Sequence, residues 1–157
     1  MKRHVLYVED DESDRFLMEK AFAKEGVVES LRMVGSGEEA IDYLSGKGVY
    51  ADREQHPFPA VVLLDLNLGP VHGFEVLNWI RTQSAQANLP VVVFSSSVRE
   101  EDHAEARRLG ANRFITKPSL PSRFVEVVRM LKERWLDSGG GAENEGVYSG
   151  TGRPNPT

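Results

Sequence analysis

Polar side chains follow four apolar runs of the sequence, at the points where the runs end. In chain order these side chains belong to Glu9, Asp10 and Asp11, to Asp65 and Asn67, to Ser95, Ser96 and Ser97, and to Lys117. Carboxylates gathered without a thiol or a paired histidine suit a hard cation such as Mg²⁺, which takes oxygen ligands and keeps several waters. The cation and the Lys117 ammonium would both offset the repulsion among the acids. The sequence therefore predicts cation-assisted chemistry at a carboxylate, provided that the ends of these runs meet.

The elements that must bring these residues together alternate along the chain. Five apolar runs predict strands, over residues 4–8, 31–34, 60–64, 90–94 and 113–116. A segment with helical spacing of apolar residues follows each run, at 13–25, 36–44, 74–80, 97–109 and 124–131, and the second and fourth open on capping-box patterns, Ser36–Glu39 and Ser97–Glu100. Five strand–helix repeats predict an α/β fold, an open parallel sheet with helices on both faces. In such a sheet the site lies at the carboxyl ends of the strands.

The composition excludes several classes of function. The chain has 24 acidic and 19 basic residues, a net charge of −5 and no Lys/Arg-rich run, so nucleic acid is disfavoured as its main ligand. The lack of cysteine excludes disulfides, thiolate metal sites and a cysteine nucleophile. No apolar stretch approaches the roughly 18 residues of a membrane span, and the first residues lack the apolar core of a signal peptide. We therefore expect a cytoplasmic protein with no membrane partner.

The composition changes abruptly after Asp137. Residues 138–157 hold six glycines and two prolines but few apolar residues, so we expect a flexible Gly-rich tail after a single domain over residues 1–137. Within the domain, residues 46–59 show no clear periodicity and form a connection longer than usual. We expect this segment to be a surface insertion loop.

The residues at the strand ends also carry a family resemblance. Glu9-Asp10 after the first strand, Asp65 closing VVLLD, Ser95 closing VVVFS and Lys117-Pro118 closing FITKP resemble the receiver domain of two-component response regulators, over residues 3–136. The long segment before the third strand and the sequence motif LLDLNL resemble the corresponding parts of single-domain regulators that serve bacterial phytochrome kinases. The resemblance implies a flavodoxin-like (βα)₅ fold with strand order 2-1-3-4-5.

The resemblance assigns a role to each acidic strand-end position. It implies that Asp65 is the phosphoacceptor, which takes a phosphoryl group from the phosphohistidine of a sensor kinase. A carboxylate is an adequate nucleophile for such a transfer once its charge is neutralised. Asp10 and Asp65 would bind Mg²⁺ directly, Asn67 would add its backbone carbonyl, and Glu9 would hold a water of the metal. Asp11 is expected in the first turn of the first helix, where a carboxylate meets the helix dipole.

The same resemblance assigns the hydroxyl, the ammonium and one ring. Ser95 would hydrogen-bond one phosphoryl oxygen and Lys117 would pair with another. Phe114 takes the position of the switch aromatic, whose rotamer reports the state of Ser95. Pro118 after Lys117 indicates a fixed turn, for which a cis peptide bond is one option.

Two positions near the phosphoacceptor depart from the family pattern. Gly69-Pro70 shifts a proline by one residue, and His72 stands where an acid usually precedes Gly73. We expect His72 to lie in an exposed loop and to play no part in metal binding.

Two other functions compete with a phosphorylation-dependent switch. A phosphatase of the haloacid dehalogenase type also uses a strand-end Asp with Mg²⁺, but it needs a second Asp two residues on, where this chain has Asn67, which cannot exchange a proton. A small-molecule binder of the flavodoxin type needs a Gly-rich phosphate loop after the first strand, which is missing. We therefore expect a switch that catalyses only its own phosphorylation and dephosphorylation, and that acts by protein contact or phosphate relay without an appended DNA-binding domain.

One surface of the domain is expected to contact the output partner. The fourth helix offers only Val98, Ala104, Ala106 and Leu109 as apolar anchors, so we expect it to shift at modest cost and to form the output face with the fifth strand and fifth helix.

On the fifth helix, Val125, Trp135 and Leu136 lie off the core stripe or at its far end. An uncovered apolar patch there predicts a homodimer through the fourth helix, fifth strand and fifth helix.

Overall fold

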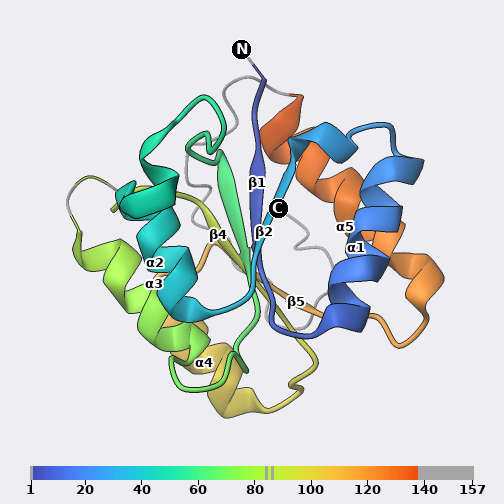
Figure 1. Cartoon of the computed structure of the whole chain (residues 1–157). Helices are drawn as coiled ribbons and strands as arrows, with labels where there is room; N and C mark the ends of the chain where they lie inside the picture. Colours follow the sequence, from blue (N-terminus) through green and yellow to red (C-terminus); the bar gives the residue numbers. More distant parts are fainter. Residues whose placement is uncertain (1, 84, 86, 138–157) are drawn as a thin grey trace.

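Five parallel strands form the centre of the molecule. The computed structural model describes residues 2–83, 85 and 87–137. The strands are β1 (Val5–Val8), β2 (Leu31–Val34), β3 (Val61–Leu64), β4 (Val91–Ser95) and β5 (Arg113–Thr116). All pairs are parallel and the order across the sheet is 2-1-3-4-5, which confirms the fold implied by the resemblance (Figure 1).

Helices cover both faces of this sheet. They are α1 (Glu12–Lys24), α2 (Gly37–Ser45), α3 (Gly73–Thr82), α4 (Glu100–Arg108) and α5 (Phe124–Leu131). Figure 1 shows α1 and α5 together on one side and α2, α3 and α4 on the other. No helix in the described part of the chain is both long enough and apolar enough to cross a bilayer.

The core consists of two hydrophobic clusters, one on each face of the sheet. Alternate strand residues divide between them, because successive side chains of a strand point to opposite faces. Val8, Leu64 and Val93 belong to the cluster under α2, α3 and α4. Tyr7 and Phe94 belong to the cluster under α1 and α5. The strands are therefore buried on both faces, as their continuous apolar runs predict.

The segment between α2 and β3 folds back against α2. It contains a 3₁₀ turn (Gly48–Ala51), and the Arg53 guanidinium donates hydrogen bonds to the carbonyl oxygens of Tyr43 (2.8 Å) and Leu44 (2.9 Å) in the last turn of α2. The Tyr50 hydroxyl donates to Glu39 Oε2 (2.5 Å). The Arg53 bonds reach carbonyls at the end of α2, and together with the Tyr50 bond they fix a segment that has no apolar periodicity.

Only one of the two predicted capping boxes begins its helix as expected. The Ser36 hydroxyl accepts from Glu39 N (3.0 Å) at the start of α2. The capping box predicted at Ser97–Glu100 is wrong, because α4 starts two residues later, with Arg99 at the N-cap and no side-chain cap. The Ser97 hydroxyl instead accepts a hydrogen bond from Arg99 N and donates one to Asp102 Oδ2.

Trp135 corrects the expectation of an uncovered apolar patch. After α5 the chain continues through a π-helical turn (Lys132–Leu136), and Trp135, four residues after the buried Leu131, packs into the α1 and α5 side of the core. Its side chain is only 3% exposed, and Val125 and Leu136 are partly buried against the same cluster. This patch therefore does not support a homodimer. The tail predicted over residues 138–157 lies outside the described residues.

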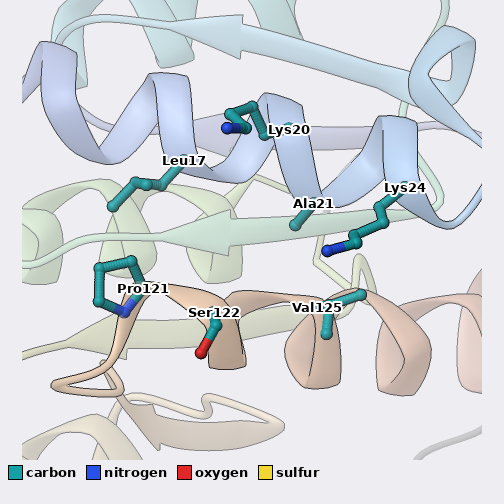
Figure 2. Close-up of a pocket in the computed structure, with 7 residues that line it drawn as sticks. All are labelled: Leu17, Lys20, Ala21, Lys24, Pro121, Ser122 and Val125. Carbon is teal, nitrogen blue, oxygen red and sulfur yellow. The ribbon is translucent and has the colours of Figure 1, made fainter.

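A shallow groove runs between α1 and α5. Its lining joins apolar side chains, Leu17 and Val125 among them, with Lys20 and Lys24 of α1 and Pro121 before α5 (Figure 2). Beyond the groove, Glu25 pairs with Arg129 Nε at 3.0 Å and with Lys132 Nζ at 3.7 Å. These contacts connect the C-terminal end of α1 to α5 and its extension. The position of α1 matters for the site, because α1 begins directly after the acidic residues that follow β1.

Candidate functional site

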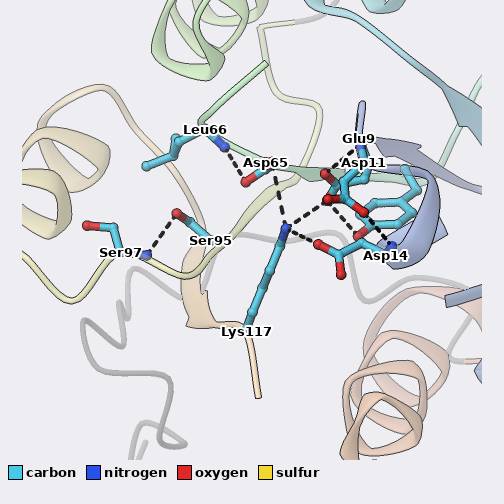
Figure 3. A network of polar contacts seen from close by, with 9 residues as sticks. Glu9, Asp11, Asp14, Asp65, Leu66, Ser95, Ser97 and Lys117 are labelled. Carbon is cyan, nitrogen blue, oxygen red and sulfur yellow. Dashed lines mark hydrogen bonds and ion pairs between the residues drawn. The ribbon is translucent and has the colours of Figure 1, made fainter. Parts of the chain in front are cut away.

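The sheet register brings the predicted residues to one edge. Val8 pairs with Leu64, and Ser95 pairs with Thr116, so the residues that follow these strands lie side by side. Figure 3 shows Glu9, Asp65, Ser95 and Lys117 meeting at this edge. The structure thus brings together the strand-end residues on which the predicted chemistry depends.

Three of the predicted carboxylates form one cluster. Glu9, Asp10 and Asp65 each place a carboxylate oxygen within 4.8 Å of the others. Glu9 and Asp65 are buried, with 1% and 4% of their surface exposed, whereas Asp10 lies at the surface. Three oxygen donors that are open to water on one side fit a hard cation that retains part of its hydration.

Lys117 bridges this cluster from the opposite side. Its Nζ donates hydrogen bonds to Glu9 Oε1 (2.9 Å) and Asp14 Oδ2 (2.7 Å), and it lies 3.7 Å from Asp65 Oδ2. Burial alone lowers the pKa of Lys117, but the hydrogen bonds that Lys117 donates to Asp14 and Glu9, together with the charges of Asp65 and Glu9, outweigh burial and raise it. The ammonium therefore stays charged and offsets part of the negative charge of the site.

The negative charge still exceeds the positive charge around Asp65. Burial, and then the charge of Glu9, raise the pKa of Asp65 to about 7, against the opposing effect of Lys117. The Leu66 amide also donates a hydrogen bond to Asp65 Oδ1 (2.8 Å) and favours the ionised form. A carboxyl group with a pKa this far from its ordinary value, in an open site, marks a functional position.

Two functional neighbours were missed by sequence reasoning. The Tyr7 hydroxyl donates to Glu9 Oε1 (2.9 Å), and burial followed by the charge of Glu9 raises the pKa of Tyr7. Asp14 binds Lys117 from the first turn of α1. Only its place three residues after Asp11 could have indicated Asp14, because the Asp11 side chain accepts from Asp14 N (3.0 Å) as the N-cap of α1. That capping role confirms the position expected for Asp11.

Ser95 and Asn67 flank the cluster in different environments. Ser95 is fully buried at the end of β4, and its hydroxyl accepts a hydrogen bond from Ser97 N at 3.1 Å (Figure 3). Asn67 is exposed in the loop after β3. The roles of both residues toward a phosphoryl group and a metal stay predictions.

Gly73 explains how α3 can start beside Asp65. A Cβ atom at Gly73 would lie 2.3 Å from the Asp65 carbonyl oxygen, so no larger residue fits without moving this loop. His72 does not lie in a free loop, as was expected, but is the N-cap of α3. Its Nδ1 accepts from Phe74 N (3.0 Å), and Glu75 Oε2 accepts from His72 N (3.4 Å).

The last strand supplies the remaining predicted residues. Phe114 is fully buried and stacks on His103 of α4, with ring centroids 3.8 Å apart. The described residues contain no cis peptide bond, so the bond before Pro118 is trans and the cis option is wrong. Lys117 N donates to the Ser95 carbonyl (2.9 Å), which ties the ends of β4 and β5 together.

Comparison with known proteins identifies the family of this chain. Residues 5–129 match the response regulator receiver domain. The response regulator Rcp1 of Synechocystis is 30% identical over 134 residues, which cover 85% of this chain and 89% of Rcp1.

Two solved structures agree with this match. The phosphorylated cyanobacterial phytochrome response regulator RcpA superposes with a TM-score of 0.79 at 34% identity, over 88% of this chain and 96% of RcpA. The Mn²⁺-bound form of Rcp1 gives 0.73 at 29% identity, over 87% and 96% of the two chains. The haloacid dehalogenase alternative finds no support among these relatives. The chain belongs to the response regulator receiver domain family, with phytochrome-associated regulators among its relatives.

Proposed function

We propose that this protein is a single-domain response regulator that accepts a phosphoryl group on Asp65 from a histidine kinase in a Mg²⁺-dependent reaction. The observation that carries the proposal is the buried Asp65 carboxylate, held 3.7 Å from the Lys117 ammonium beside Glu9 and Asp10. The resemblance to the phosphorylated regulator RcpA supports the same assignment.

The transfer needs Asp65 in its ionised form. One carboxylate oxygen of Asp65 forms the new bond to phosphorus while the bond from phosphorus to the kinase histidine nitrogen breaks, and the electron pair returns to that nitrogen. The Lys117 ammonium is placed to neutralise one phosphoryl oxygen, and the Ser95 hydroxyl to hydrogen-bond another. The protein catalyses this step, and the later hydrolysis, on itself alone.

The carboxylate cluster is the proposed metal site. Asp10 and Asp65 would bind Mg²⁺ directly, Glu9 through a water, and Asn67 through its backbone carbonyl. The bound cation would supply charge neutralisation for both the carboxylate and the incoming phosphoryl oxygens. Burial, followed by the charge of Glu9, raises the pKa of Asp65, and a bound cation would offset both effects because it stabilises the ionised carboxylate.

Phosphorylation is expected at Asp65 only. We would incubate the full chain with acetyl phosphate and Mg²⁺ and map the acyl phosphate after reductive trapping. Asp65→Asn should lose the label, whereas Asp11→Asn, which removes a charge beside the site but keeps a side chain able to cap α1, should keep it. A label that persists in Asp65→Asn would refute the proposed function.

Mg²⁺ should bind before phosphorylation, and Asp10 should be needed for binding. Losing one direct oxygen ligand is expected to weaken binding roughly tenfold or more. Amide NMR shifts during a Mg²⁺ titration of the parent, Asp10→Ala and the control Asp11→Ala measure the effect. Equal affinities for all three chains would exclude Asp10 as a ligand.

The proposed phosphodonor is a sensor histidine kinase, with a bacteriophytochrome as the leading class because phytochrome regulators are among the relatives. A donor that reaches Asp65 must approach the carboxyl edge of the sheet from the cytoplasm. There a cavity of about 600 Å³ beside Lys117 shares Leu17 and Pro121 with the groove between α1 and α5. The output partner would be a protein or a phosphotransfer domain that contacts α4, β5 and α5.

A homodimer through α4, β5 and α5 stays part of the proposal, on a different surface from the Trp135 patch. A hollow of about 500 Å³ along β5 and α5 is lined by Ile115, Met130 and the exposed Leu120. Sedimentation at several concentrations, with and without a phosphoryl mimic, should show dimers that Leu120→Asp weakens and Val49→Asp, a distant exposed substitution, does not. A monomer at every concentration would exclude the dimer.

A further inference from the structure

The helix α4 is attached to the sheet by very few side chains. Of the four anchors expected from the sequence, Val98 is 78% exposed and Ala104 is exposed, Leu109 is half-buried, and only Ala106 is fully buried. The second buried side chain of α4 is His103, a polar residue with 5% exposure in a helix otherwise rich in charge.

His103 makes its ring contact with one residue of β5. Its imidazole stacks on the Phe114 ring at a centroid distance of 3.8 Å and an interplanar angle of 22°. Nearly parallel rings keep their contact when one of them slides within its plane. The Phe114 side chain therefore lies between the backbone of β5 and the His103 imidazole of α4.

Phe114 also lies close to Ser95 in the sheet. Phe114 is the cross-strand partner of Val93, and Ser95 follows Val93 by two residues, so Val93 and Ser95 point to the face that α4 covers. The Ser95 hydroxyl accepts from Ser97 N, and the Ser97 hydroxyl donates to Asp102 Oδ2 (2.5 Å), the residue before His103. Two routes thus lead from Ser95 to the first turns of α4.

We infer that His103 is a positioning residue that couples α4 to Phe114, so that α4 follows Phe114 when a phosphoryl group on Asp65 engages Ser95. This inference rests on the proposed function. The Ser97–Asp102 bond orients the start of α4, but it lies in a partly exposed loop, whereas the His103–Phe114 stack is buried and reaches the middle of the helix. Without the ring, Ala106 and Leu109 would hold α4 in place with little dependence on the position of Phe114.

The test measures the response of α4 to a phosphoryl mimic in the full chain. Hydrogen exchange of residues 100–108 would be compared with and without beryllofluoride and Mg²⁺. The variants are His103→Ala, which removes the ring, His103→Phe, which keeps one, and His103→Leu, which keeps apolar volume without a ring. Ala104→Ser on the exposed face of α4 is the matched control.

The parent, Ala104→Ser and His103→Phe should show a difference in exchange, and His103→Ala and His103→Leu should lose it. All five chains should be phosphorylated by acetyl phosphate at the same rate, which a general loss of structure would not allow. If His103→Ala proves unstable, the contrast between His103→Phe and His103→Leu decides alone. A response in His103→Leu equal to that of His103→Phe would overturn the inference, whereas a parent that is never phosphorylated would instead refute the proposed function.

Discussion

Replacing Lys117 by methionine is expected to abolish phosphorylation and to destabilise the fold by about 3–5 kcal/mol, the usual cost of removing one partner from a buried charge pair. The ammonium lies 2.9 Å from Glu9, 2.7 Å from Asp14 and 3.7 Å from Asp65. Methionine keeps most of the apolar stem but leaves these carboxylates facing one another without a cation.

Thermal unfolding and acetyl-phosphate labelling measure the two effects of Lys117→Met. Lys2→Met is the matched control, because Lys2 pairs with Glu29 at 3.1 Å but both side chains are about half exposed. Such an exposed pair is screened by water and contributes little to stability. Added Mg²⁺ should recover part of the lost stability, since it supplies positive charge to the same carboxylates. Equal melting temperatures for the two variants would mean that Lys117 is not needed to balance the site.

The second large effect concerns stability against pH in the absence of metal. The pKa of Asp65 is raised to about 7 in the folded chain, so the folded state binds a proton that the unfolded chain releases near pH 4. The stability contributed by this proton is complete below the unfolded pKa and is lost as pH rises toward 7. Asp65→Asn, which cannot ionise, should therefore be more stable than the parent at pH 8, by up to about 4 kcal/mol.

Melting curves in EDTA at pH 5 and pH 8 provide the measurement. The gain from Asp65→Asn should be small at pH 5, where the parent carries most of the proton, and large at pH 8. Glu133→Gln, at an exposed position far from the site, should show no such dependence. A gain that is the same at both pH values would show that burial of the Asp65 charge does not limit stability.

The fold and the core of the site could be predicted from the sequence for a specific reason. Continuous apolar runs followed by helical spacing leave few arrangements other than a parallel sheet, and parallel strands place their carboxyl ends together. Glu9, Asp65 and Lys117 could be placed from this rule without knowing any side-chain position. Burial on both faces is likewise visible in AVVLL and PVVVF.

The residues that the sequence did not reveal depend on how helices rotate against the sheet. Asp14 reaches Lys117 across 103 residues of chain, and no local pattern shows which side of α1 will face β5. His103 looks like a solvated residue in a charged helix, and its burial follows from the position of Phe114. Trp135 follows Leu131 by four residues and therefore continues the core stripe of α5, which the expectation of an uncovered patch at the end of the helix did not take into account.

The bond between Lys117 and Glu9 joins residues that are 108 positions apart, and β5 lies at an edge of the sheet, bonded only to β4. During synthesis the acidic residues of β1 and β3 leave the ribosome long before the lysine that balances them. Closing so long a loop is entropically costly and comes late in folding. A nascent or truncated chain that lacks β5 therefore carries an acidic edge without the lysine that balances it, and the site is complete only after the last strand has docked.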